Sequence, residues 1–192
     1  ILNIKASQAL YPVLSIIEVY LRNAIDIMFQ KVIKRNWLED ELKQQNFLFA
    51  YDYNKLHEAY NKLHSKYEKI NITRGKIISE LNFGFWTDLC SKKYNPVIWT
   101  KKHAFKMVFP NFPADEKQNI GAIAQKILKI KNLRNRIFHY EPILKENSDF
   151  LLIYKDIIDI ISYLPQGSRK VILETDKFTD TILEIQKNWK KK

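Results

Sequence analysis

The residues best able to do chemistry lie near the end of one predicted helix, where an arginine interrupts an apolar stripe. On an ideal helix that turns about 100° per residue, Arg134 falls within an arc otherwise formed by isoleucines. An arginine in such an arc is costly unless it is paired, faces a solvated pocket or lies at an interface. Functional sites are expected at local conflicts of this kind, and an accessible guanidinium could hold a phosphate. The isoleucines of the arc are Ile120, Ile123, Ile127, Ile130 and Ile137.

Two structural explanations of Arg134 compete with a functional one. The guanidinium could form a buried ion pair, for which Glu18 in the first predicted helix is the candidate partner. Alternatively, the long side chain could extend along the apolar surface and reach solvent. The residue pattern alone leaves these interpretations open.

A histidine follows at position 139, five residues after Arg134. On a straight helix this spacing separates the two side chains by about 140°, whereas Asn135 and His139 share a face. Arg134 and His139 could still act on one phosphate if the last turn of the helix is distorted. They could also do so if a second copy of the helix supplies the missing group in a symmetric dimer. The structural alternative is that His139 is only a favourable cation at a helix end.

The spacing of apolar residues predicts an all-α fold in which helices position these side chains. The helix that carries Arg134 is expected from about 114 to 141, opened by Pro113 and stopped by Pro142. The first helix is expected over 11–36, with Pro12 in its first turn, and Asn82–Trp86 is expected to break or kink a helix that resumes to about Lys92. The other predicted helices cover 52–70, 73–81 and 96–108, and C-terminal helices span 150–190.

Composition predicts one folded domain over residues 1–192, because 46% of the residues are apolar. The four glycines favour long helices, and the lone Cys90 excludes an internal disulfide and a cysteine-rich zinc site. A single thiol indicates a reducing compartment, so a cytoplasmic location is expected, and with no apolar run of about 18 residues no membrane segment is expected. The net charge of +11 indicates either a polyanionic partner or only a lysine-rich, solvated surface.

Three stretches resemble the Abi-like (abortive infection) branch of the HEPN superfamily. Within 133–143, the run Arg-Asn-Arg-Ile-Phe-His, followed after one residue by Glu-Pro-Ile, is similar to the superfamily signature. That signature is an arginine, an adjacent polar residue and a histidine four to six residues later. The segment 18–24 resembles the first-helix pattern Glu-x-x-Leu-Arg-Asn. The block 83–86, with Trp99 and Phe109-Pro110 downstream, resembles the central Phe-Gly-x-Trp block, and the resemblance covers about residues 8–164.

The resemblance implies a HEPN-like helical bundle with additional helices. It also implies a metal-independent endoribonuclease that works as a homodimer in phage defence or as a toxin. Arg134 would hold and neutralise the scissile phosphate, and His139 would act as general base or acid on the RNA 2′-hydroxyl. Asn135 would orient the histidine or a phosphate oxygen, and the product would be a 2′,3′-cyclic phosphate. An antitoxin or regulatory protein is a further expected partner, whereas no cofactor or metal is expected.

Further residues are assigned to RNA binding or to support of the motif. For Arg22 and Asn23, a structural ion pair and hydrogen bond with Glu18 are equally expected. HEPN toxins controlled by nucleotidyltransferase antitoxins carry a tyrosine two residues after the histidine, where this chain has Glu141, so that mode of control is not inferred. The residues assigned to these roles are Glu18, Arg22, Asn23, Arg136 and Tyr140.

Weaker signals remain. His57 and His64 lie seven apart on one predicted helix face and could bind a metal, but no third ligand is evident. The aromatic residues of 83–86 could stack on bases, although a core position beside Gly84 is favoured. Two alternative functions stay open: a non-catalytic HEPN module that binds RNA or a protein, and a helical DNA-binding regulator. No glycine-rich phosphate loop and no Ser-His-Asp motif is present.

Overall fold

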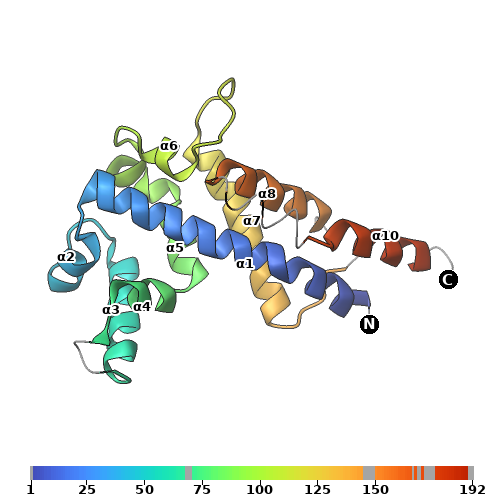
Figure 1. Cartoon of the computed structure of the whole chain (residues 1–192), viewed down its shortest axis with the longest axis horizontal. Helices are drawn as coiled ribbons and strands as arrows, with labels where there is room; N and C mark the ends of the chain where they lie inside the picture. Colours follow the sequence, from blue (N-terminus) through green and yellow to red (C-terminus); the bar gives the residue numbers. More distant parts are fainter. Residues whose placement is uncertain are drawn as a thin grey trace.

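A long amino-terminal helix runs through the molecule, and most of the other helices pack against it. In the computed structural model this helix, α1 (Leu2–Met28), contacts α5, α6, α7, α8 and α10 (Figure 1). The structure describes residues 2–67, 71–144, 150–165, 167, 170 and 176–189, and it has no β-strand within these ranges. The remaining elements are η1 (Phe29–Ile33), α2 (Trp37–Lys43), α3 (Ala50–His64), α4 (Arg74–Glu80), α5 (Phe83–Leu89), η3 (Lys92–Tyr94), η4 (Asn95–Trp99), α6 (Ala104–Val108), α7 (Ile120–Phe138), α8 (Phe150–Tyr163) and α10 (Phe178–Trp189).

The all-α prediction is therefore confirmed, but the start predicted for the first helix is wrong. α1 begins at Leu2, so Pro12 lies inside the helix rather than in its first turn. An internal proline removes a backbone hydrogen bond and costs about 3 kcal/mol. The extra turns bury Ala6 and Leu10 completely, and α1 packs against α10. This burial offsets the cost of the proline, a tertiary effect that spacing along one helix does not reveal.

The helix that carries Arg134 is shorter than the predicted 114–141. It is α7, Ile120–Phe138, and its N-cap is Asn119, whose Oδ1 accepts a hydrogen bond from the backbone N–H of Ala122 at 3.2 Å. The proline and acidic residues expected to open the helix lie in a preceding turn instead, where the N–H of Glu116 bonds to the carbonyl of Pro113. The apolar arc is confirmed, because all five of its isoleucines are buried, and α7 packs along α8.

The predicted break near 82–86 is confirmed but is shorter, because α4 ends at Glu80 and the resumed helix, α5, already begins at Phe83 and ends at Leu89 rather than near Lys92. Asn82 caps α5, because its side-chain oxygen accepts a hydrogen bond from the N–H of Phe85 at 2.9 Å. Phe83, Phe85 and Trp86 are at most 2% exposed. Their predicted place in the core is confirmed, and this burial excludes them from stacking on bases.

Two other helices differ from the prediction in their limits, and one agrees. The predicted helix 52–70 ends at His64 in α3, and residues 68–70 fall outside the described ranges. The predicted helix 96–108 is divided into η4 and α6 by His103, whose φ of 69° is left-handed. The predicted cap of α4 is confirmed, since Thr73 accepts a hydrogen bond from the N–H of Lys76.

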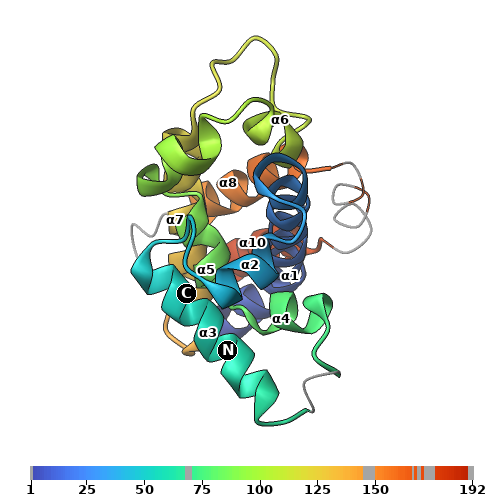
Figure 2. The same ribbon diagram turned by 90° about the vertical axis from the view of Figure 1, so that its left-hand side faces the viewer.

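The helices surround α1 unevenly, and this leaves parts of α7 open. Figure 2 shows α6 at one end of the molecule and α3 with α4 at the other. α5 contacts both α1 and α7, and α3 contacts α5, so the opening beside α7 is formed by α3 and α5. No helix in the described part of the chain is both long and apolar enough to cross a membrane.

Candidate functional site

α7 crosses α1 (Figure 1), and Arg134 of α7 faces Glu18 of α1. The Nη2 of Arg134 is 3.4 Å from Oε2 of Glu18, and the two side chains are 24% and 25% exposed. The predicted ion pair is therefore present, but it is long and open to solvent. Such a pair contributes at most about 1 kcal/mol. A guanidinium has five N–H donors, so this contact leaves Arg134 able to bind another anion.

An aromatic contact explains how Arg134 fits into an apolar arc. Its guanidinium carbon lies 3.9 Å from the centre of the Phe138 ring, which in turn stacks on Tyr11 of α1 at 5.2 Å. The Nε of Arg134 is buried and has no hydrogen-bond partner. The cation–π contact with the Phe138 ring is therefore the main interaction that offsets the burial of this part of the guanidinium. Sequence analysis missed Phe138 and Tyr11. The signal for Phe138 was its place four residues after Arg134, on the same helix face.

Arg134 and Asn135 line the same pocket, so the structure brings together two of the three predicted catalytic residues. The pocket has a volume of about 310 Å³ and lies between α3, α5 and α7. Lys55 and Lys131 line it as well, and Asp88 is the one carboxylate among its described lining residues. Its other lining residues are Tyr51, Asn82, Phe83 and Gly84.

The charges of this pocket are organised around Asp88. Its carboxylate oxygens lie 3.0 Å from Nζ of Lys55 and 3.2 Å from Nζ of Lys131. Burial alone would raise the pKa of Asp88, but the hydrogen bond from Lys55 and the charge of Lys131 lower it overall below the ordinary value. The carboxylate is therefore ionised at neutral pH, and with Arg134 the pocket holds three cations against one anion.

Sequence analysis missed Lys55, Asp88 and Lys131 as members of the site. Lys131 lies three residues before Arg134, so helical spacing could have placed it on the same face. Lys55 and Asp88 belong to α3 and α5. Only the tertiary fold brings them to α7, and no spacing along the chain indicates it.

His139 is the C-cap of α7 and is exposed, and it is not among the residues that line the pocket of Arg134 and Asn135. Its φ of −91° and ψ of 11° lie outside the helical region, so the predicted distortion at the end of the helix is present. The helix ends at Phe138 rather than at Glu141. Within one chain, this distortion does not bring His139 into the pocket that Arg134 lines.

Backbone hydrogen bonds close the end of α7 in a Schellman motif. The N–H of Glu141 bonds to the carbonyl of Arg136 at 2.8 Å, and the N–H of Tyr140 bonds to the carbonyl of Ile137 at 3.1 Å. Tyr140 takes the left-handed position of the motif with φ 58°, where glycine is usual, and its side chain is 93% exposed. A non-glycine residue in this conformation is strained, and such strain tends to be found at functional sites.

Arg136 supports this chain reversal. Its guanidinium donates a hydrogen bond to the carbonyl of Pro142, and its Nε lies 3.8 Å from a carboxylate oxygen of Glu141. The backbone N–H of Ile143 then bonds to Oδ1 of Asn3 at 2.6 Å, which ties the segment to the start of α1. The side-chain contacts of Arg136 therefore support the motif segment.

Arg22 and Asn23 lie on α1, and the Nε of Arg22 is 3.5 Å from Oδ1 of Asn23. The ion pair considered between Arg22 and Glu18 does not form in the described structure, because Glu18 faces Arg134. Asn23 is exposed and Arg22 is half-buried. Neither residue lines the pocket of Arg134 and Asn135.

His57 and His64 lie on α3, each beside a tyrosine ring, at 4.4 Å from Tyr53 and 6.2 Å from Tyr60. Nowhere in the described ranges do three or more histidine, cysteine, aspartate or glutamate side chains gather as a metal site would require. The contacts of these histidines are thus aromatic neighbours on their own helix.

Comparison of the chain with protein-family models, with curated proteins and with solved structures finds no match in any of the three.

Proposed function

We propose that this protein is a metal-independent endoribonuclease of the HEPN type that acts in the cytoplasm, in phage defence or as a toxin. The observation that supports the proposal best is the convergence of Lys55, Lys131 and Arg134 on one open pocket. A pocket with this excess of positive charge suits the phosphates of a nucleic acid, and the net charge of +11 agrees with a polyanionic ligand.

In the proposed reaction, the 2′-oxygen of a ribose attacks the adjacent phosphorus. The bond from phosphorus to the 5′-oxygen breaks, and a 2′,3′-cyclic phosphate forms. Arg134 neutralises the charge that builds on the phosphate oxygens, while Asn135 donates a hydrogen bond to one of them. His139 accepts the proton of the 2′-hydroxyl or returns one to the leaving oxygen. Because the 2′-hydroxyl is the nucleophile, RNA is cut and DNA is not.

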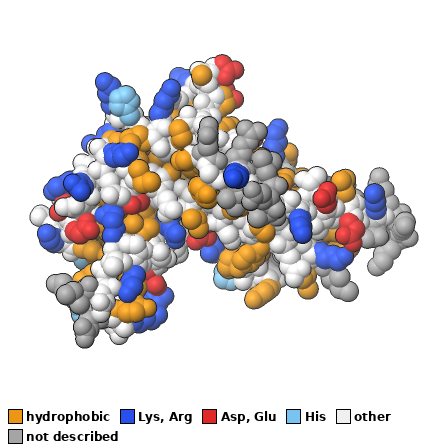
Figure 3. All heavy atoms as spheres, viewed as in Figure 1, with side chains coloured by type: hydrophobic (Ala, Val, Ile, Leu, Met, Phe, Trp, Pro, Cys, Tyr) orange, Lys and Arg blue, Asp and Glu red, His pale blue; other side chains and the backbone are white. Residues whose placement is uncertain are grey.

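A homodimer would reconcile this chemistry with the position of His139. Because His139 lies outside the pocket of its own Arg134, we propose that a second copy supplies the histidine through a two-fold axis near the end of α7. Tyr11, Phe138 and Tyr140 are exposed at this end, at 48%, 40% and 93%. Figure 3 shows apolar side chains gathered where α7 ends. Exposed aromatic groups of this kind are typical of interfaces, and the same surface suits an antitoxin or regulatory protein.

Incubation of the purified protein with total RNA and a chelator tests the proposal. The wild type should cleave RNA and leave cyclic phosphate ends, whereas Arg134→Ala and His139→Ala should lose at least about 100-fold in rate. His64→Ala is the matched control, since it removes an exposed histidine from α3, and it should cleave normally. Equal cleavage by the wild type and His139→Ala, or none by the wild type, would exclude the nuclease.

A second candidate is a non-catalytic HEPN module that binds RNA. It is favoured by the separation of His139 from the Arg134 pocket and by the contact of Arg134 with Glu18. This candidate predicts salt-sensitive RNA binding without cleavage, unchanged in His139→Ala.

A further inference from the structure

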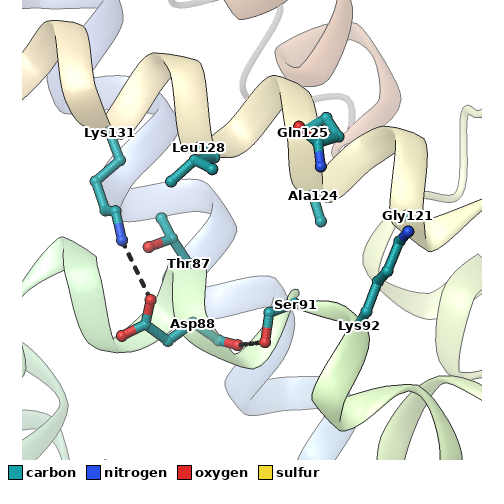
Figure 4. A pocket seen from close by; sticks show the side chains of 9 residues that line it. All are labelled: Thr87, Asp88, Ser91, Lys92, Gly121, Ala124, Gln125, Leu128 and Lys131. Atoms are coloured by element: carbon teal, nitrogen blue, oxygen red, sulfur yellow. Dashed lines mark hydrogen bonds and ion pairs between the residues drawn. The ribbon is translucent and has the colours of Figure 1, made fainter.

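A second hollow lies further along α7, on the side that faces α5 and η3. One wall is α7 from Gly121 to Lys131, and the other is formed by Thr87, Ser91 and Lys92 (Figure 4). Gly121 is close to Lys92: a Cβ added to the glycine would lie 3.4 Å from Cε of that lysine. The small side chain of Ala124 also leaves room on this face of the helix.

The two hollows adjoin each other, because Asp88 and Lys131 line both of them. Their lining residues follow α7 from Gly121 to Asn135, mostly at three- and four-residue steps, and Arg134 lies about half a turn round the helix from Gln125. From Gly121 to Asn135 the helix rises about 21 Å at 1.5 Å per residue. The lining residues on α7 are Gly121, Ala124, Gln125, Leu128, Lys131, Arg134 and Asn135. The term α7 groove is used below for the two hollows together.

Positive side chains are distributed along the whole α7 groove. Lys92 lies at one end, Lys131 in the middle and Arg134 at the other end. No ion pair is found for Lys92 among the described residues, so its charge is not offset by a nearby carboxylate. A row of cations beside polar groups such as Gln125 and Asn135 suits a ligand whose negative charges repeat along its length.

We propose that the α7 groove binds the sugar-phosphate backbone of a single-stranded nucleic acid, and that Asp88 is an internal anion which competes with the phosphates for Lys55 and Lys131. The proposal rests on the proposed function in taking RNA as the natural ligand. A length of about 21 Å accommodates at most about six nucleotides, the number reached when the strand keeps the duplex rise of 3.4 Å per nucleotide, and fewer when the strand is extended. The groove runs between α7 on one side and α5 with η3 on the other, so it suits one strand better than a duplex.

Asp88 has the position that this role requires. Figure 4 shows its carboxylate directed toward Lys131 across the groove. The same carboxylate contacts Lys55, so it holds both lysines that line the pocket of Arg134. A phosphate that enters the groove must share these ammonium groups with a carboxylate that stays ionised. Removing the carboxylate therefore frees two cations for the ligand.

Fluorescence anisotropy with a labelled ten-nucleotide oligothymidylate tests the groove separately from catalysis, because DNA lacks the attacking hydroxyl. Lys92→Gln and Lys131→Gln should each weaken binding about 3- to 10-fold, with the salt slope reduced by about 0.7 per lysine. Lys129→Gln is the matched control: it lies on α7, has the same charge change and faces Asp156 at 3.9 Å. Its affinity should change less than twofold. Lys92→Gln keeps the test valid if Lys131→Gln fails to fold.

Asp88→Asn should bind the oligonucleotide about 3- to 10-fold more tightly, with a steeper salt dependence. A duplex of the same length should bind more weakly than the single strand to the wild type. Equal effects of Lys131→Gln and Lys129→Gln, tighter binding of the duplex, or weaker binding by a folded Asp88→Asn protein would overturn the proposal. If the groove variants weaken binding but the wild type does not cleave RNA, the nuclease proposal is rejected and the groove proposal stands. If the wild type cleaves RNA but Lys92→Gln binds the oligonucleotide normally, the groove proposal is rejected and the nuclease proposal stands.

Discussion

The contacts that hold Arg134 are individually weak, and this favours a functional role over a structural one. Its ion pair with Glu18 is long and partly exposed, and its guanidinium rests on Phe138. Methionine can fill the same space and contact the same ring. Because the side chain of Glu18 is 25% exposed, its carboxylate can be hydrated when the guanidinium is removed, so little stability depends on this ion pair.

We therefore expect Arg134→Met to change the free energy of unfolding by less than about 1 kcal/mol, while RNA binding or cleavage falls at least about tenfold. Urea denaturation measures the first quantity, and the RNA assay measures the second. A loss of more than about 3 kcal/mol would identify Arg134 as a structural residue instead.

Tyr140 is the clearest strained residue in the motif segment. A left-handed conformation costs a non-glycine residue about 1–2 kcal/mol, and glycine adds flexibility worth about 0.5–1 kcal/mol to the unfolded chain. Tyr140→Gly should therefore stabilise the protein by about 0.5–1 kcal/mol, measured by thermal or urea unfolding. Tyr140→Ala keeps the backbone cost and is the control, with no gain expected. A destabilised Tyr140→Gly protein would mean that the exposed ring makes a stabilising contact.

At the scale of the helix, the N-cap of α7 positions the whole motif. Asn119→Ala removes the acceptor of the bond from the N–H of Ala122 and should cost about 1 kcal/mol of stability. Asn119→Asp retains an acceptor and adds a favourable charge at the helix start, so it should fold as well as the wild type. Chemical denaturation of the three proteins makes the comparison, and equal stability of Asn119→Ala and the wild type would show that the cap is dispensable.

The sequence predicted that the helices exist and which of their faces are buried better than it predicted the residues at which they begin and end. Periodic apolar spacing correctly placed the buried isoleucines of α7, and Thr73 correctly marked the start of α4. The end predicted at Glu141 was wrong because Pro142 only sets an outer limit, whereas the Schellman hydrogen bonds stop the helix at Phe138. The interior position of Pro12 could not be predicted, since it depends on packing between α1 and α10, which are far apart in sequence.

Only those residues of the candidate site that lie on α7 or on the first helix could be predicted from the sequence. Arg134, Asn135 and the Glu18 partner followed from spacing on helices and from one charge in an apolar arc. Lys55 and Asp88 reach the pocket from α3 and α5, so only the fold joins them to Arg134. Whether His139 meets Arg134 depends on a second copy of the chain, which stays a prediction.

For the molecule as a whole, a buried thiol and three buried or half-buried phenols with raised pKa values determine how the stability of the fold changes at alkaline pH. Burial raises the pKa of the Cys90 thiol above its ordinary 9.0 and of the phenols of Tyr94 and Tyr163 above 10.0. Burial, together with the hydrogen bond to Asp176, raises the pKa of Tyr154 to about 12. Each group keeps its proton in the folded state at a pH where the unfolded chain has lost it.

These four groups therefore make their full contribution to the free energy of unfolding below about pH 9. That contribution is lost as the pH rises through their folded-state pKa values. We expect urea midpoints to fall steadily from pH 9 to pH 12. Tyr154→Phe should be less stable at pH 7, because its bond to Asp176 is gone, but should show a shallower alkaline decline. A midpoint that stays constant up to pH 11 would contradict this account of the core.

The central claim, that two chains build one nuclease site, is tested most directly by mixing two inactive variants. If Arg134 of one copy works with His139 of the other, a heterodimer of Arg134→Ala and His139→Ala contains one intact site. With random exchange of subunits, half of the dimers are mixed and each has one of two sites, so about a quarter of the wild-type activity should return. A mixture that stays inactive under conditions where the wild type cleaves RNA would contradict the shared site.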